Sequence, residues 1–492
     1  MSPFRGVAGA IAVAAAICTG LAAAPSDTAP ITHVLNRIGY GARPGDVERV
    51  AAMGLTTYID RQLHPERLPD PEVDRRLAEL ETLTMTSREL AERYFVPALM
   101  ERRARQRAAA ENGEAGKGKD QPPRDRGNAM NGPRRVLAEL GEQRLLRAVY
   151  SERQLNEVLV DFWFNHFNVF AGKGPDRIYV TEYERDVIRP RVLGKFRDLL
   201  GAVAESPAML FYLDNWMSSS EKVSGTFFGR RPLKKVPDTF SRRPTGLNEN
   251  YARELLELHT LGVDGGYTQK DVVEVARAFT GWTIDRPRTG GGFRFDGRMH
   301  DGGEKVVLGQ TIRAGGKGEG ERVLDFLAAH PSTARFIATK LTRRFVSDGP
   351  PAGLVDRAAA RFQETGGDLR ETVRVILTSA EFLAPGSRHA KVKTPLEFVV
   401  SAVRASGAEV VSALPLMRAL NELGMPLYLC QPPTGYADTA ETWITTGGLL
   451  NRMNFALALT DGRLKGIRVE RDAAPDTGLS AQALGSPEFQ RR

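Results

Sequence analysis

The stretch LNEVLVDFWFNHFNVF, residues 155–170, is apolar on almost every side of a helical projection. A helix of that kind must be covered on all sides, so it predicts the central helix of a helical protein. Its polar side chains form one stripe: Glu157, Asp161, Asn165 and Asn168. Buried polar groups need partners, water or a ligand. The stripe therefore either pairs with a neighbouring helix, for example through Arg253 or Arg185, or lines a polar cleft.

A second helical stretch, NENYARELLELHTLG at residues 248–262, places a histidine among its leucines. On a helical wheel, His259 points inward, whereas Glu249 and Arg253 form an i,i+4 pair on the other side. Gly262 follows as a C-cap. His259 is then either a neutral core imidazole hydrogen-bonded to a backbone carbonyl, or a ligand or acid/base group facing an internal pocket. His166, in the first stretch, also lies among apolar residues.

A third group of reactive side chains lies in MHDGGEK, residues 299–305. His300, Asp301 and Lys305 combine a base, a carboxylate and a cation on a glycine-rich turn, and loops often carry function. The alternative is a turn in which Asp301 caps its own backbone. The thiol of Cys430, in LYLCQPPTGY, has apolar and proline neighbours, which favours an inert packed cysteine over a nucleophile.

The fold class expected from these patterns is mainly α, a multi-helix globular domain with one small β-hairpin near residues 291–312. The strand signal is the alternation around Phe293 and Phe295, followed by the apolar run 306–308. Most of the remaining periodic segments have helical spacing.

One domain is expected over residues 31–460. A segment at about 108–133 is dense in Gly, Pro and charge and predicts a disordered insert, and 218–246 predicts an irregular loop. The last residues, 463–492, are expected to form a flexible tail.

The first 24 residues have the layout of a secretory signal peptide, with one positive charge, an apolar run and small residues near the end. We therefore expect export to the periplasm or the extracellular space. No later stretch approaches 18 consecutive apolar residues, so no transmembrane segment is expected in the mature chain. Without the leader, Cys430 is the sole cysteine, which excludes an internal disulfide.

The net charge of +8 invites comparison with nucleic-acid-binding proteins. The excess lies in two stretches, RRARQR at 102–107 and residues 229–244, and neither interleaves aromatic residues with the charges. With the export signal, this argues against nucleic acid and leaves a polyanion or a glycan as the expected partner.

Several motifs with known chemistry are absent from the sequence: HExxH, CxxC, GxSxG, GxxxxGK[ST] and a GxGxxG that follows a strand. The histidines at 166, 259 and 300 are far apart in the chain. Any metal site built from them would depend wholly on the fold, so metal and cofactor stay open.

The sequence resembles the bacterial proteins grouped as "domain of unknown function 1800". The resemblance rests on phrases that run in order over about residues 31–460, among them LNRIGYGARPGDVERV, LVDFWFNHFNV, GLNENYARELLELHTLGVDGGYTQKDVVEVARAFTGW and LLNRMNFA. It implies an exported, mostly helical protein whose gene often neighbours that of an alkaline-phosphatase-like exported protein, a candidate partner. It implies no reaction and no catalytic residue. Tyr436 stands where the family's Gly-Trp-Pro turn has tryptophan.

Three hypotheses for function follow. The first is an exported enzyme with an acid/base cleft that acts on a polar polymer such as a glycan. Its candidate site residues are Asp161, Asn165, Glu249, Arg253, His259, His300 and Asp301. The second is a metal- or haem-dependent oxidoreductase with His259 or His166 as ligand. The third is a non-catalytic cell-envelope or assembly protein whose polar helix faces are structural ion pairs.

Overall fold

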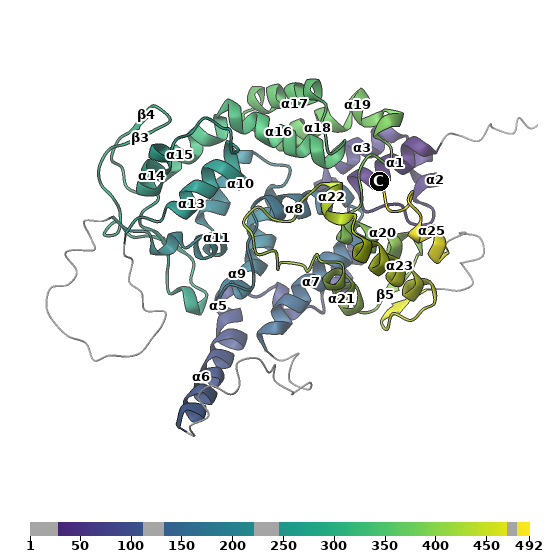
Figure 1. Ribbon diagram of the computed structural model, residues 1–492, viewed down its shortest axis with the longest axis horizontal. Helices are drawn as coiled ribbons and strands as arrows, with labels where there is room; N and C mark the ends of the chain where they lie inside the picture. Colours follow the sequence, from purple (N-terminus) through teal and green to yellow (C-terminus); the bar gives the residue numbers. More distant parts are fainter. Residues whose placement is uncertain (1–27, 112–131, 221–245, 470–479) are drawn as a thin grey trace, which may run out of the picture.

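Helix α8, Gln154–His166, lies at the centre of the computed structural model, which describes residues 28–111, 132–220, 246–469 and 480–492 (Figure 1). Its apolar side chains are covered on all sides, and Leu155, Leu159 and Trp163 are each 0% exposed. The indole Nε1 of Trp163 donates to the carbonyl of Val192 at 3.2 Å. The predicted central helix is therefore confirmed, and so is the mainly α class.

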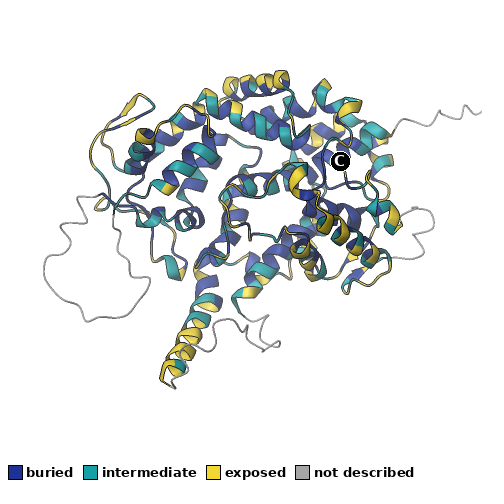
Figure 2. Cartoon of the chain, viewed as in Figure 1, coloured by how far each residue is buried: buried dark blue, intermediate teal, exposed yellow. Residues whose placement is uncertain are grey.

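The chain enters through short helices that pack beside α8 and then leaves the body along one long helix. In order these are α1 (Ala29–Ile38), α2 (Asp46–Met53), α3 (Leu55–Gln62), η1 (Pro65–Arg67), α4 (Pro71–Leu77), η2 (Glu81–Leu83), α5 (Ser87–Leu90), the π-helical η3 (Ala91–Phe95) and α6 (Val96–Glu111). No residue of α6 is buried. Figures 1 and 2 show this helix projecting away from the body.

The next helices build most of the core, and two of them, α7 and η4, pack directly against α8. They are α7 (Pro133–Tyr150), α9 (Asp176–Glu182), the π-helical η4 (Tyr183–Ile188), η5 (Arg189–Arg191), α10 (Phe196–Glu205), α11 (Pro207–Tyr212), η6 (Asn215–Met217), α13 (Glu249–Glu254), the π-helical η7 (Leu255–Thr260) and α14 (Gln269–Ala278). Figure 2 shows the buried side of these helices facing inward.

Two small hairpins stand where one was predicted. Strands β1 (Trp282–Ile284) and β2 (Phe293–Phe295) pair antiparallel, as do β3 (Lys305–Val307) and β4 (Gln310–Ile312), and η8 (Pro287–Thr289) lies between β1 and β2. The strand residues near 293 and 306 therefore belong to different hairpins. The prediction missed β1 because it has only three residues, Trp282–Ile284, too few for their alternation to stand out as a strand signal.

A layer of packed helices covers one side of the molecule: α15 (Gly318–Ala329), α16 (Pro331–Phe345), α17 (Ala352–Glu364), α18 (Leu369–Leu377) and α19 (Ala380–Leu383), followed by η9 (Pro385–Ser387). The C-terminal part adds α20 (Pro395–Ala405), β5 (Glu409–Val410), α21 (Leu414–Glu422), α22 (Ala440–Trp443), α23 (Thr446–Thr460), β6 (Ile467–Arg468) and α25 (Ala481–Gly485). Strands β5 and β6 pair antiparallel.

The last residues of the chain are packed rather than frayed. Helix α25 contacts α23, Leu484 is 0% exposed, and Arg492 is 2% exposed. The expectation of a flexible tail is thus wrong for 480–492, because apolar and basic side chains of this short segment find partners that are distant in sequence.

Other predicted segments lie outside the described residues. These are the leader at 1–24, most of the insert at 108–133 and most of the loop at 218–246. At the insert's edges α6 continues to Glu111 and α7 begins at Pro133. In the part of the chain that the structure describes, no helix has the length and apolar character needed to span a membrane.

Candidate functional site

Three basic side chains meet beside the end of α8: His166, the last residue of that helix, His259 from η7 and Lys340 from α16. We call them the imidazole–lysine cluster. Lys340 Nζ lies 2.9 Å from His166 Nδ1, and the rings of His166 and His259 are 6.3 Å apart between centroids. The cluster is assembled by tertiary packing, since its members lie far apart in the chain.

The contacts of His166 define its protonation state. Its Nε2 lies 3.2 Å from the main-chain carbonyl oxygen of His259, so Nε2 carries the hydrogen and donates it. Nδ1 is then the acceptor for the ammonium of Lys340. Burial, Lys340 and His259 together hold the pKa of His166 well below 6.5. His166 is therefore a neutral imidazole of defined tautomer.

His259 points inward, as predicted, and is 2% exposed. Its ring packs edge-on against Phe167, with 5.1 Å between centroids. Burial, and secondly the charge of Lys340, lowers the pKa of His259 to about 3. The predicted hydrogen bond from this ring to a backbone carbonyl is not found among the described residues. Instead, the carbonyl of His259 itself accepts from His166.

Lys340 is the unusual member of the cluster. Burial lowers its pKa to about 8, although the charge of Asp438 partly offsets this effect. No carboxylate of the described residues lies within 4.0 Å of its Nζ. A lysine with this pKa is neutral in about a tenth of molecules at pH 7, so it can accept a proton near neutrality.

The end of η7 brings these elements together. Helix α13 widens into the π-helical η7, a type of turn often found at functional sites. Gly262 then adopts φ +84°, where a Cβ would lie 2.9 Å from Phe336 Cδ2. Because glycine permits this close approach, α16 packs against the helix end. Lys340, one turn after Phe336, is thereby placed near His259.

Glu254, the last residue of α13, adds a carboxyl group one π turn before His259. It is half-buried and has no hydrogen bond or ion pair with any described residue. Burial, and secondly the charge of Glu257, raises the pKa of Glu254. A raised pKa suits a carboxylic acid that donates a proton.

The carboxylates of the α8 stripe belong to a buried ion network. Asp161 accepts from Arg144 Nη1 at 2.8 Å, and Glu157 accepts from Arg189 Nη1 at 2.6 Å. Both arginines also bind Glu184, at 2.6 Å and 3.0 Å. Pairing with neighbouring elements is thus confirmed, but the expected partners were wrong.

The two arginines that were expected to pair with the stripe lie elsewhere. Arg253 contacts Gln269 and Glu249, and Arg185 contacts Asp186 and the carbonyls of residues 83 and 85. Glu249 and Arg253, both proposed site residues, are each 41% exposed and pair with one another at 3.5 Å. The structure leaves them on the surface, away from the ion network.

The asparagines of the stripe hold the loop that carries Cys430. Asn165 exchanges hydrogen bonds with the main chain of Tyr436, and Asn168 Nδ2 donates to the carbonyls of Cys430 and Pro432. Together with Asp161 they line a cavity of about 20 Å³, room for roughly one water molecule. Burial raises the pKa of the Cys430 thiol to about 11, as expected for a packed cysteine.

The MHDGGEK turn forms a separate polar cluster. His300 Nε2 lies 3.1 Å from Glu319 Oε1, and Lys305, 0% exposed, also pairs with Glu319. Asp301 accepts from Arg277 Nη2 at 2.9 Å and from the backbone N–H of Gly303 at 2.9 Å. The latter is the self-capping turn that was the alternative to a functional site.

A larger cavity, of about 310 Å³, lies apart from the imidazole–lysine cluster. It is bordered by the start of α1 and by Arg388, His389 and Arg492. Thr28, on its rim, adjoins residues outside the described ones. None of the predicted site residues lines it.

Of the predicted site residues, the structure brings Asp161 and Asn165 together at one cavity, and His300 and Asp301 at one turn. His259 lies with His166, and the two missed residues are Lys340 and Glu254. The sequence did hold a signal for Lys340. In HPSTARFIATKLTRRF, residues 330–345, this lysine borders the apolar face of its helix. Within the described ranges, no three His, Cys, Asp or Glu side chains are grouped so that they could hold a metal ion.

Fold and site together define a mainly helical protein with a basic cluster, two buried histidines and a half-buried lysine, at the meeting point of three elements. The family described as "Protein of unknown function (DUF1800)" matches residues 33–491, nearly the whole chain. The protein belongs to this family, which confirms the resemblance seen in the sequence. No curated protein and no solved structure matches it significantly.

Proposed function

We propose that this protein is an exported enzyme that uses the imidazole–lysine cluster for acid/base chemistry on a polar polymer such as a glycan. The observation that carries the proposal is Lys340, whose pKa is about 8 and whose Nζ is bonded to a neutral imidazole rather than to a carboxylate. Perturbed titratable groups of this kind concentrate at functional sites.

The roles follow from the protonation states. Neutral Lys340 takes a proton from a water molecule or a sugar hydroxyl, and His166 orients the amine through its Nδ1 lone pair. His259 supplies the carbonyl that fixes the tautomer of His166. Glu254, whose pKa is raised by burial and by the charge of Glu257, is the candidate acid for the leaving group.

The test compares Lys340→Met with wild type on a panel of neutral and anionic polysaccharides, measuring new reducing ends. We expect a loss of about 100-fold or more in the variant, the usual range for removing an acid/base group. The wild-type rate should rise with pH to a midpoint near 8, because the working form of Lys340 is the neutral one.

The matched control is Lys270→Met, which removes an exposed lysine of α14 and should keep the wild-type rate. Equal activity of Lys340→Met and wild type would remove Lys340 from the mechanism. Inactivity of the wild type on every polymer would instead support a second candidate function.

That second candidate is a non-catalytic envelope or assembly protein. It is favoured by the buried network in which Arg144, Arg189, Glu157, Asp161 and Glu184 saturate one another. Such polar faces are structural and need no substrate.

Export is part of both candidates and rests on the layout of residues 1–24. Expression of the full chain in a bacterial host, followed by mass measurement of the periplasmic protein, tests it. A periplasmic product shortened by about this length is expected, and an uncleaved cytoplasmic product would contradict export.

A further inference from the structure

Among the described parts of the chain, the long helix α6 packs mainly against η3, the π-helical turn that precedes it. Its 16 residues include none that is buried, and α6 projects from the body (Figures 1 and 2). At 1.5 Å per residue it reaches roughly 24 Å. A helix without a buried residue gains little from core packing, so its surface chemistry is the feature to explain.

The surface of α6 is dominated by arginine. The stretch RRARQR, in which the sequence concentrates positive charge, lies on this helix. Four arginines outnumber two glutamates, and one of these glutamates, Glu101, pairs with Arg105. Arg102 and Arg107 have no hydrogen bond or ion pair with any described residue and lie on different sides of the helix. Among the described residues, Arg102 and Arg107 thus leave positive charge without a carboxylate partner on two sides of the arm.

Three further arginines at the base of the arm extend this surface. Arg88 and Arg134 are exposed, Arg177 is half-buried, and none has a partner among the described residues. Arg177 Nε is buried without an acceptor, and the pKa of Arg177 is lowered by burial and by the charge of Arg134. The positive charges of Arg134 and Arg177 thus repel one another, and no carboxylate of the described residues pairs with either, an arrangement that an anion would stabilise.

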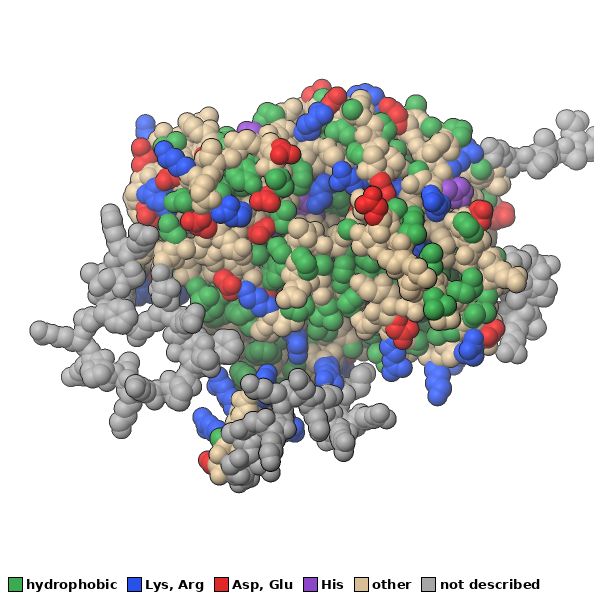
Figure 3. Space-filling view, in the orientation of Figure 1, with side chains coloured by type: hydrophobic (Ala, Val, Ile, Leu, Met, Phe, Trp, Pro, Cys, Tyr) green, Lys and Arg blue, Asp and Glu red, His purple; other side chains and the backbone are tan. Residues whose placement is uncertain are grey.

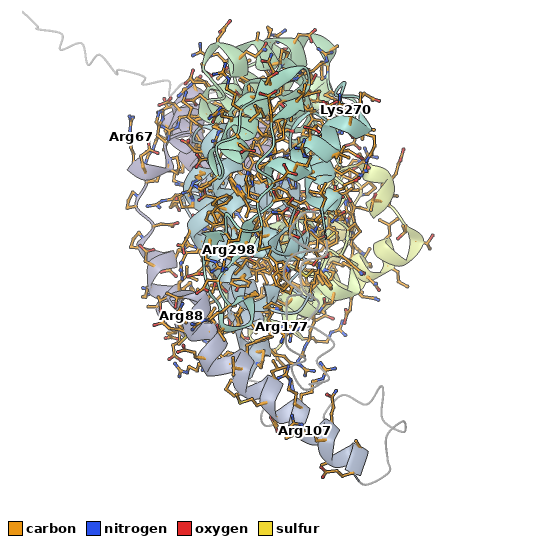
Figure 4. The ribbon with its side chains drawn as sticks, turned by 90° about the vertical axis from the view of Figure 1, so that its left-hand side faces the viewer. Arg67, Arg88, Arg107, Arg177, Lys270 and Arg298 are labelled. Carbon is orange, nitrogen blue, oxygen red and sulfur yellow. The ribbon has the colours of Figure 1, made fainter. Side chains whose placement is uncertain are left out.

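Figure 4 places three of these arginines, Arg88, Arg107 and Arg177, at one end of the molecule. Figure 4 shows Arg88 and Arg177 beside the point where α6 leaves the body, and Arg107 toward its tip. In Figure 3, Lys and Arg side chains gather on and around this arm. Arg67 and Lys270 lie at the other end of the molecule, far from the arm (Figure 4).

The composition of α6 favours a soluble polymer over a membrane surface. A helix that lies in a membrane interface needs an apolar face, and beyond Met100 the only apolar residues of α6 are alanines. Stacking of nucleic-acid bases would need aromatic side chains, and α6 has none. Guanidinium groups bind carboxylate, sulfate and phosphate in bidentate fashion, which suits a charged polysaccharide.

We infer that α6, together with Arg88, Arg134 and Arg177, is a docking arm for an anionic polysaccharide. The inference deepens the proposed function, since it gives the charge of the polymer, but binding can be measured without turnover. Repeating anionic groups along a polymer match a row of guanidinium groups along the arm, and release of counterions drives the association.

The test measures binding of the full mature protein to polygalacturonate and heparin, with neutral dextran as control. The arm variant is Arg102→Gln/Arg107→Gln/Arg134→Gln. We expect a loss of affinity of about tenfold or more at low salt, and a weaker salt dependence than that of wild type. The matched control, Arg67→Gln/Lys270→Gln/Arg298→Gln, removes the same charge elsewhere and should bind as wild type does.

An equal loss in both variants, or none in the arm variant, would overturn the inference. Preferential binding to vesicles of anionic phospholipid or to single-stranded DNA would also overturn it, in favour of another partner. Lys340→Met separates this inference from the proposed function, because it should keep full binding while losing turnover. If the arm variant kept both normal turnover and unchanged polymer binding, the docking arm would be refuted and the proposed function would stand.

Discussion

At the scale of single residues, burial sets the chemistry of the histidines. His259 and His166 are neutral at physiological pH because the surrounding helices exclude water and Lys340 adds a positive charge. Burial also lowers the pKa of His33, on α1, to about 4. The inward position of His259 was predictable from its spacing among leucines. The position of Lys340 near His259 was not predictable, because 81 residues separate the two in the chain.

This burial predicts the pH dependence of stability. The folded pKa of His259 is about 3, below the unfolded value of about 6.5, so the unfolded state binds the proton first as the pH falls. The stability that the neutral ring contributes is fully present above pH 6.5 and is lost as the pH falls toward 3. At pH 5 the loss is about 2 kcal/mol.

We expect His259→Leu to fold well at pH 7.5 and to lack this part of the acid sensitivity, as measured by urea midpoints from pH 7.5 to 4.5. His389→Asn is the control, because His389 is exposed and asparagine tolerates its φ of +57°. If the urea midpoints of His259→Leu and wild type fell equally with pH, the low pKa assigned to His259 would be refuted. A large loss at pH 7.5 would reveal an additional structural role for the imidazole.

At the scale of elements, helix ends decide which side chains meet. The sequence predicted that Gly262 ends its helix, and φ +84° confirms it. The change from α13 to the π-helical η7 could not be predicted from the leucine pattern. A π turn rotates the side chains that follow it around the helix axis by only a fraction of a turn. The partner of that helix end, Phe336 of α16, is a tertiary contact.

Gly262→Ala should destabilise the protein by about 2 kcal/mol. The left-handed backbone costs an alanine about 1 kcal/mol, and its Cβ would meet Phe336 at 2.9 Å. Gly318→Ala, at the start of α15, is the control, since nothing lies within 4 Å of the added Cβ. Thermal unfolding of the two variants checks this, and similar melting temperatures would show that the helix end tolerates an ordinary residue.

At the scale of the whole molecule, the C-terminal segment closes the fold. Arg492 Nη2 lies 3.0 Å from Glu397, and Gln490 Oε1 accepts from Arg452 at 2.7 Å. The main chains of Arg492 and Lys391 also pair. Both ionic partners are buried, so loss of this segment removes one of the two arginines, Arg344 and Arg492, that pair with Glu397 inside the protein.

Removal of residues 486–492 should therefore lower the melting temperature by several degrees, since each lost bond to a charged group is worth about 1.5–3 kcal/mol. Arg491→Ala is the control, because that side chain is exposed. A truncated protein that melts with wild type would restore the view of 480–492 as a dispensable tail.

The helical class, the central position of α8 and the inward turn of His259 followed from the sequence alone, because apolar periodicity is a local property that burial must satisfy. The end of a helix at Gly262 was equally predictable. The second hairpin, the packed C-terminal segment, the arginine partners of the α8 stripe and the meeting of Lys340 with two imidazoles were decided by tertiary structure. Each of these depends on contacts between residues distant in the chain, and a side chain's pKa depends on the neighbours and the water that those contacts admit or exclude.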